Sequence, residues 1–335
     1  MNPSEAQPTR GVAAFSKNEM GHSPAIRIES LRHFYGAREA LAGISLQVER
    51  GEIFGLLGPN GGGKTTLFRI LCTLMPMHEG KVQVFTYDLL QDAHAIRSHL
   101  GVVFQHPSLD GKLTVFENLW HYGHLYGLKG RRLRERARVV LQRLGLYERR
   151  DDLVETLSGG LQRRVELAKA FIHEPALLLL DEPSTGLDPG ARLDFTAYLE
   201  HLRDVDGVSI LLTTHILEEA ERCDRVGILH QGHLVAVGTP DELKARVGGD
   251  VVVVQTANPE GLQARIRQRF HCEPMVVEHS VRVEIAQGHA FVRDVVEAFA
   301  DEIQAVTFGK PTLEDVFIHL TGHRLWQGRE SGGRA

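Results

Sequence analysis

Gly58-Pro59-Asn60-Gly61-Gly62-Gly63-Lys64-Thr65-Thr66 is the stretch that decides the fold of this chain. It fits the pattern G-x-x-x-x-G-K-[ST], and the flanking residues predict a strand at 53–57 before it and a helix from residue 66 after it. Glycine lets the backbone turn so that successive N–H groups point at phosphate oxygens, and the new helix presents the positive end of its dipole. We therefore expect the loop to bind the phosphates of a nucleotide, with Lys64 on the β- and γ-phosphates and Thr65 on Mg²⁺.

The size and composition of the chain are those of an ordinary globular protein. Its 335 residues suffice for two domains of roughly 100–200 residues, and 42% hydrophobic residues can fill their cores. The longest apolar runs, at 176–180 and 251–254, are far shorter than the roughly 20 residues that span a bilayer. Residues 1–24 lack an apolar core and predict a disordered leader rather than a signal peptide, and residues 323–335 predict a flexible tail.

Charge and cysteine content narrow the class of partners. Lys plus Arg number 38 against 43 for Asp plus Glu, so the net charge is −5 and no nucleic-acid partner is expected. Cys72, Cys223 and Cys272 are few and widely spaced, which fits the reducing cytoplasm better than a disulfide framework. The eighteen histidines form no paired ligand set, so we expect no metal site built from them.

The order of elements predicts an α/β domain over residues 25–246. Residues 44–48 alternate like a half-buried antiparallel strand, whereas 177–180 and 209–212 are continuously apolar like central parallel strands. We expect one sheet with mixed edges. From about 93 to 160 helices dominate, which predicts a helical insertion, and its basic run at 131–136 is typical of a solvated helix face.

The order changes after residue 246. A strand (251–256), a helix (261–270), a hairpin (274–285), a helix (291–300) and a strand (304–308) follow one another. This is the split βαβ order of a small ferredoxin-like module. We expect a second, α+β domain over 247–322, closed by a helix at 312–321.

Two carboxylates stand at the end of an apolar strand, where parallel sheets place their ligands. Asp181 suits Mg²⁺, and Glu182, one residue later, can face the γ-phosphate and polarise the attacking water. The alternative is that both acids merely end a strand before Pro183. The phosphate loop elsewhere in the chain favours the catalytic interpretation.

Ser158-Gly159-Gly160 opens a second helix that suits an anion, although a plain serine N-cap followed by glycines would look the same. The stretch Leu157-Ser-Gly-Gly-Leu-Gln162 resembles the signature of ATP-binding cassette (ABC) transporter ATPases, with Leu161 where Gln, Met or Glu is common. The resemblance covers residues 26–246.

Four further residues match that family's pattern in order. Tyr35 resembles the aromatic residue that stacks on adenine, and Gln105 the glutamine that touches Mg²⁺ or the attacking water. Asp188 resembles the aspartate of a loop that crosses to a partner subunit, and His215 the histidine on the γ-phosphate. Each alone could be structural, and Asp188-Pro189 is also a good helix start. Their order and spacing favour the family.

The resemblance implies an ATPase of the ABC type that uses ATP and Mg²⁺. It implies catalytic roles for Glu182, His215 and Gln105, and Mg²⁺ ligation by Thr65, Gln105 and Asp181. It also implies a head-to-tail dimer, in which ATP lies between Lys64 of one subunit and Ser158 of the other, docked through the helical insertion on separate multi-span membrane permease subunits at the cytoplasmic face of the membrane.

Residues 311–322, 102–110 and 113–119 are similar to the drug-resistance type, which serves ABC-2 exporters. The alternatives are a soluble ABC ATPase acting on ribosomes or nucleic acid, and a nucleotide-gated scaffold. A soluble ABC ATPase of that kind usually has two cassettes or a long coiled coil. A nucleotide-gated scaffold need not keep Lys64, Asp181, Glu182 and His215.

Overall fold

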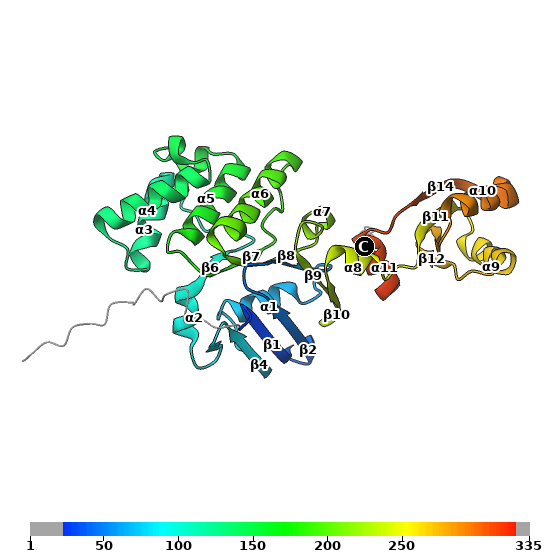
Figure 1. The fold of residues 1–335 in the computed structure, drawn as a ribbon, viewed down its shortest axis with the longest axis horizontal. Helices are drawn as coiled ribbons and strands as arrows, with labels where there is room; N and C mark the ends of the chain where they lie inside the picture. The colour runs from blue at the N-terminus through cyan, green and yellow to red at the C-terminus, as the bar shows by residue number, and fades with distance from the viewer. Residues whose placement is uncertain (1–22, 326–335) are drawn as a thin grey trace, which may run out of the picture.

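The computed structural model describes residues 23–325 (Figure 1). Most of the leader expected at 1–24 and of the tail expected at 323–335 lies outside the described residues. No helix of the described part is long and apolar enough to cross a membrane. The α/β class predicted from the sequence is confirmed.

The parallel strands form a six-stranded sheet in the order β10-β9-β3-β8-β7-β6, in which only β10 runs antiparallel to its neighbour. Its strands β3, β7 and β8 are buried along their whole length, as their continuous apolar runs predict. The strands are β3 (Ile53–Leu57), β6 (Leu100–Val103), β7 (Leu177–Asp181), β8 (Ser209–Thr214), β9 (Arg225–His230) and β10 (His233–Gly238).

A separate antiparallel sheet has the order β2-β1-β4-β5, so the prediction of a single sheet is wrong, although the parallel sheet does have a mixed edge at β10. Helix α1 (Lys64–Leu71) explains the separation, because it buries most of its residues and contacts strands of both sheets. Its Leu67 and Phe68 pack in one core with residues of both. The strands are β1 (Ile26–Tyr35), β2 (Arg38–Val48), β4 (Glu79–Val84) and β5 (Tyr87–Asp88).

The helical insertion follows the edge strand β6. Because β6 pairs with β7 in the parallel sheet and α2 packs on β5 and β6, the insertion begins after Val103 and not at about residue 93. Thr114 caps α3 with a capping box to Glu117, which fixes where that helix begins. The helices between β6 and β7 are α3 (Val115–Leu125), α4 (Gly130–Arg143), η1 (Tyr147–Arg149), η2 (Val154–Thr156) and α5 (Gly159–Phe171). Helix α2 (Ala93–His99) precedes β6, and α6 (Pro189–Asp206) follows β7.

The C-terminal residues form a four-stranded antiparallel sheet in the order β12-β13-β11-β14, with α9 and α10 packed on one face. Val252, Val254, Val281 and Val283 of the strands meet apolar residues of both helices in that core. The elements are β11 (Asp250–Thr256), α9 (Pro259–Phe270), β12 (Met275–Val277), β13 (Ser280–Ile285), α10 (Gly288–Phe299), η3 (Ala300–Glu302) and β14 (Ile303–Gly309).

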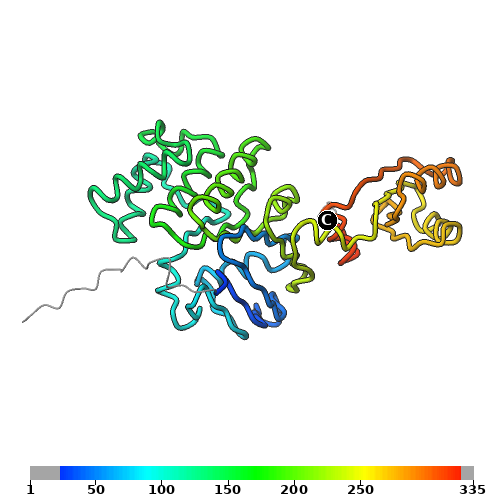
Figure 2. The backbone as a smooth tube through the Cα atoms, in the orientation of Figure 1, coloured from blue at the N-terminus to red at the C-terminus, as the bar shows by residue number. Residues whose placement is uncertain are grey.

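Helix α11 (Leu313–Thr321) packs in one core with residues of the large domain and with Val251 of the small sheet. The chain leaves the large domain after α8 (Pro240–Lys244), forms the small sheet and returns through β14, so that α11 lies beside α8 (Figures 1 and 2). Leu313, Val316 and Phe317 pack in the core of the large domain. Helix α11 also contacts α7 (Leu217–Ala220), so its apolar face packs on the large domain as well as on residues of β11.

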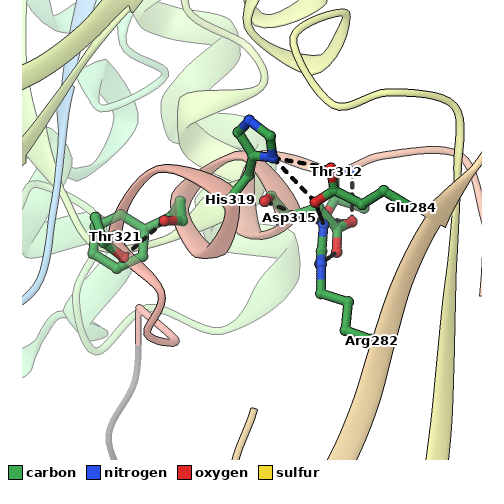
Figure 3. Close-up of polar contacts among 7 residues, drawn as sticks. Arg282, Glu284, Thr312, Asp315, His319 and Thr321 are labelled. Carbon is green, nitrogen blue, oxygen red and sulfur yellow. Dashed lines mark hydrogen bonds and ion pairs between the residues drawn. The ribbon is translucent and has the colours of Figure 1, made fainter. Parts of the chain in front are cut away.

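Polar contacts tie α11 to the small sheet on its other side (Figure 3). The buried Arg282 of β13 donates to Asp315 of α11 and, at 3.1 Å, to Glu284. Glu284 in turn lies 2.9 Å from Nδ1 of His319. Because Asp315 also completes the capping box of α11 with Thr312, the start of the helix and the link to the sheet share one carboxylate.

Candidate functional site

The phosphate loop connects β3 to α1, as its sequence predicts. A Cβ on Gly58 would lie 2.2 Å from the carbonyl oxygen of Leu229, so only glycine fits against β9 there. Gly63 adopts φ 109°, which strains any L side chain, and a Cβ on it would lie 2.8 Å from the carbonyl oxygen of Ala40. The loop is therefore shaped by strands on both sides of it.

The remaining loop residues lie along the same turn. The N–H of Gly62 donates to the carbonyl of Pro59 at 3.1 Å, and the carbonyl of Gly62 accepts from Gly232 at 3.0 Å. Asn60 and Gly61 are exposed at the tip, where a phosphate can approach. Thr65 is half-buried and Thr66 is buried, both in the first turn of α1.

Lys64 is folded into its own loop. Its ammonium donates to the carbonyl oxygens of Gly58 (2.8 Å) and Pro59 (3.2 Å) and lies 3.4 Å from Oε1 of Glu182. Burial lowers the pKa of Lys64, and the charge of Glu182 opposes that effect. The ammonium is therefore held where anionic oxygens gather, between the loop and the end of β7.

Glu182 stands at the centre of the predicted catalytic residues. Its Oε2 accepts from Nε2 of Gln105 at 3.2 Å and lies 3.1 Å from Nδ1 of His215. Burial pushes the pKa of Glu182 upward, but the His215 hydrogen bond and the charge of Lys64 outweigh it, so the pKa lies below its usual range. The carboxylate is thus held ionised and ready to accept a hydrogen bond from water.

The pKa of Asp181 is shifted in the opposite direction. It accepts a 2.5 Å hydrogen bond from Oγ1 of Thr213, and it lies buried at the tip of β7. Burial raises its pKa; the Thr213 hydrogen bond and the charge of Lys64 oppose that rise, and the charge of Glu182 adds to it. A cation nearby would stabilise the ionised form of such a buried carboxylate.

Mg²⁺ fits this donor set. Thr65 and Gln105 supply neutral oxygens and Asp181 an anionic one, the hard ligands that Mg²⁺ prefers. Within residues 23–325 no group of three or more His, Cys, Asp or Glu side chains could hold a metal by itself. Such a site suits an ion that completes its shell with phosphate oxygens and water.

Tyr35 lies at the end of β1, beside the start of α1. Its ring is 48% exposed, and its hydroxyl lies 3.4 Å from Oγ1 of Thr66 and 3.3 Å from Sδ of Met75. The ring is therefore next to the phosphate loop and open to a flat ligand. An exposed aromatic face can stack on a flat ring.

The predicted signature residues lie apart from this cluster. Ser158 caps α5, accepting from the N–H of Leu161 at 3.4 Å, and it is exposed together with Gly159. A Cβ on Gly160 would lie 3.0 Å from Cβ of Ala191, so α5 and α6 begin side by side. Asp188 is exposed there and caps α6. Among the described residues no hydrogen bond joins these groups to the phosphate loop.

Two polar residues of the site were not predicted. Thr213 bonds Asp181 and also accepts from the N–H of Glu182 at 3.0 Å, and its place at the end of the apolar run 209–212 could have indicated it. Arg163 is buried and binds the carbonyls of Asp181 and Pro183, and a single charged position in a helix carries no comparable signal.

Comparison with protein families and curated proteins shows what this chain is similar to. The model of the family described as ABC transporter matches residues 41–185. The linearmycin resistance ATP-binding protein LnrL of Bacillus subtilis is 35% identical over 90% of this chain and 99% of its own length. The daunorubicin resistance ATP-binding protein DrrA3 of Streptomyces coeruleorubidus is 38% identical over 89% and 96%. The Nod factor export ATP-binding protein I of Rhizobium meliloti is 37% identical over 90% and 89%.

Solved structures agree with the fold. The ATP-binding subunit of an ABC transporter is similar with a TM-score of 0.60 and 32% identity, covering 67% of this chain and 93% of that one. The structure of cbiO1 from Clostridium perfringens, described as part of the ABC transporter complex cbiONQ, has a TM-score of 0.63 and 26% identity, covering 74% and 96%.

Proposed function

This chain belongs to the ABC transporter family of ATP-binding subunits, and on that premise we propose that two copies close around two ATP molecules and reopen on hydrolysis. Family membership confirms the resemblance, the ABC-type fold and the ATPase activity predicted from the sequence. The chain is the ATP-hydrolysing subunit of an ABC exporter, as the names of its relatives indicate. These names do not favour action on ribosomes or nucleic acid.

The observation that carries the catalytic proposal is the set of contacts around Glu182. One oxygen faces Lys64, and the other faces Gln105 and His215. When ATP binds, the ammonium of Lys64 turns from Oε1 of Glu182 to the β- and γ-phosphates. Oε1 can then accept a hydrogen bond from water. Glu182 then orients that water toward the γ-phosphate, while His215 and Gln105 hold the carboxylate in place.

Mg²⁺ enters this proposal as the partner of Asp181, Thr65 and Gln105. When bound, it neutralises charge on the phosphate oxygens. The backbone N–H groups of residues 58–66 and the positive end of α1 bind the phosphates, and Tyr35 stacks on adenine.

The dimer proposal rests on the position of Ser158. Ser158 and Gly159 are exposed, Gly160 lies against Ala191 of α6 near the exposed Asp188, and among the described residues no hydrogen bond joins them to the phosphate loop. In a head-to-tail pair they would reach the γ-phosphate bound by Lys64 of the partner, so each ATP would join the two chains. Hydrolysis removes the shared phosphate and favours reopening.

The membrane partner would dock on the helical insertion. A groove of about 670 Å³ lies between α4 and the end of α5, with Leu128, Val139 and Ile172 as apolar lining and Arg131 and Arg132 as exposed cations. Helix α5 begins at Ser158 and ends at this groove, so it connects the ATP contact to the docking surface. We propose that a permease segment with acidic residues occupies the groove at the cytoplasmic face of the membrane.

The composite site is tested by replacing Ser158 with Arg. ATP binding to the single chain should stay within about twofold of the parent, because Lys64 and its loop are untouched, while kcat falls by about a hundredfold or more. Ser98→Arg, at an exposed serine bonded only to the nearby Ala95, is the control and should keep the parent kcat. Normal hydrolysis by Ser158→Arg would contradict the composite site.

A further inference from the structure

One face of helix α5 carries three buried charged side chains. Arg163, Glu166 and Lys169 are 7%, 0% and 6% exposed, and their three-residue spacing places them along one side of the helix. Charged side chains are rarely buried so fully unless they have partners. Their partners lie on the segment around Gln105 and at the end of β7.

Arg163 binds the main chain on both sides of the catalytic residues. Its Nη1 donates to the carbonyl of Phe104 at 2.6 Å, directly before Gln105. Its Nε donates to the carbonyl of Pro183 at 2.6 Å, and Nη2 to the carbonyl of Asp181 at 3.3 Å. One guanidinium therefore holds the residues that precede Gln105 and flank Glu182.

Glu166 and Lys169 hold the far end of the same loop. The carboxylate of Glu166 accepts from the N–H of Ser108 at 2.6 Å, and Lys169 donates to the carbonyl of Ser108 at 2.9 Å and also to its hydroxyl. The segment 104–108 is thus bonded to α5 at both ends. Hydrogen bonds on both sides of Gln105 therefore join its segment to the helix that Ser158 caps.

The backbone of Glu182 needs such support. Its φ is 45°, in the left-handed region that non-glycine residues rarely adopt. Such a conformation persists when the surroundings determine it from several sides. Arg163 holds the carbonyls of the residues before and after Glu182, and the N–H of Glu182 donates to the hydroxyl and the carbonyl of Thr213.

We propose that Arg163 is a positioning residue that fixes Gln105, Asp181 and Glu182 to the signature helix α5. The proposal rests on the proposed function, because it assigns to α5 the coupling of two ATP sites. When Ser158 engages the ATP of the partner subunit, a shift of α5 reaches the catalytic carboxylates of its own chain through the guanidinium. Arginine suits this role because its planar fork presents five donors in fixed directions, which lysine lacks.

The test compares Arg163→Lys and Arg163→Gln with the parent. We expect kcat to fall about tenfold to a hundredfold, since a small misplacement of catalytic groups has that effect, while the Kd for a fluorescent ATP analogue stays within about twofold. Arg164→Gln is the matched control: Arg164 pairs with Asp194 at 2.6 Å and lies over the ring of Tyr198, so kcat should not change.

Two further readouts separate positioning from folding. The melting temperature without nucleotide is measured for each variant, and ATP-dependent dimerisation is measured with Glu182→Gln added. A parent-like kcat in Arg163→Gln overturns the proposal, and so does a loss of ATP binding in step with kcat. If Glu182→Gln alone forms no ATP-dependent dimer, the proposed function fails instead, and the Arg163 kinetics still decide the positioning role within one chain.

Discussion

Asp181 and Glu182 are adjacent carboxylates whose surroundings shift their pKa values in opposite directions. Burial raises the pKa of Asp181, whereas His215 and Lys64 overcome the burial of Glu182 and lower its pKa. A carboxyl with a raised folded pKa reduces stability once it ionises. Without its cation, Asp181 therefore costs the folded state free energy at neutral pH. Such a cost is expected of a carboxylate with the proposed role of Mg²⁺ ligand.

Asp181→Asn should raise the melting temperature of the nucleotide-free protein at pH 7.5, because the amide oxygen can still accept from Thr213 without a buried charge. The gain should shrink as the pH falls through the raised folded pKa. It should be lost below 3.8, the ordinary pKa of Asp, because the carboxyl is then neutral in the folded and the unfolded state. The measurement is thermal unfolding in EDTA from pH 4 to 8. Magnesium and ATP should stabilise the parent more than the variant. A lower melting temperature for Asp181→Asn at pH 7.5 would count against this balance of charges.

At the same scale, the sequence predicts residues whose role depends on motif spacing. The phosphate loop and the pair Asp181-Glu182 are local signals, and the structure brings Lys64, Glu182, Gln105 and His215 together. Arg163 has no such signal, because a charged residue within a helix ordinarily lies at the surface. Its burial depends on three carbonyls that only the tertiary structure brings to one point.

At the scale of elements, α4 and α5 form the proposed dock. Arg131 and Arg132 are exposed at the start of α4, whereas Arg136 is bound to the carbonyls of Phe171 and Ile172 at the end of α5. The exposed pair is therefore available to a partner, and Arg136 joins the two helices. The basic run at 131–136, predicted as a solvated helix face, thus contains exposed arginines and one that is bound to α5.

Charge reversal at Arg131 and Arg132 together should reduce recovery of the chain with membranes that contain its natural permease by about tenfold or more. ATPase activity of the purified chain should not change, because neither residue contacts the ATP site. Arg138→Glu, on the same helix but outside this groove, is the control. Equal membrane recovery of the double variant and the parent would rule out the groove as the dock.

Element packing also shows why part of the fold escaped prediction. The apolar spacing of residues 312–321 predicts a helix with one buried face, and α11 has that face. The pattern cannot say which surface covers it, and Phe317 packs on His230 of the large domain with ring centroids 5.4 Å apart. The two separate sheets escaped prediction for a similar reason, since the burial of α1 between them depends on both.

At the scale of the whole molecule, we propose that the chain is one half of an ATP-closed clamp. Lys64, Asp181 and Glu182 lie buried together, whereas Ser158 and Asp188 are exposed, and within residues 23–325 no hydrogen bond joins the two sets. The small domain is joined to the large one through α11, where Arg282 binds Asp315 and His319 lies beside Glu284 (Figure 3). Closure of the dimer is the step that would bring the separate sets together.

The most direct test of this clamp is the mass of Glu182→Gln with magnesium and ATP, measured by sedimentation. Without hydrolysis the ATP contacts persist, so the variant should have the mass of two chains, and Ser158→Arg added to it should restore the mass of one. A Glu182→Gln chain that stays monomeric at saturating ATP, or a double variant that still dimerises, would contradict the account.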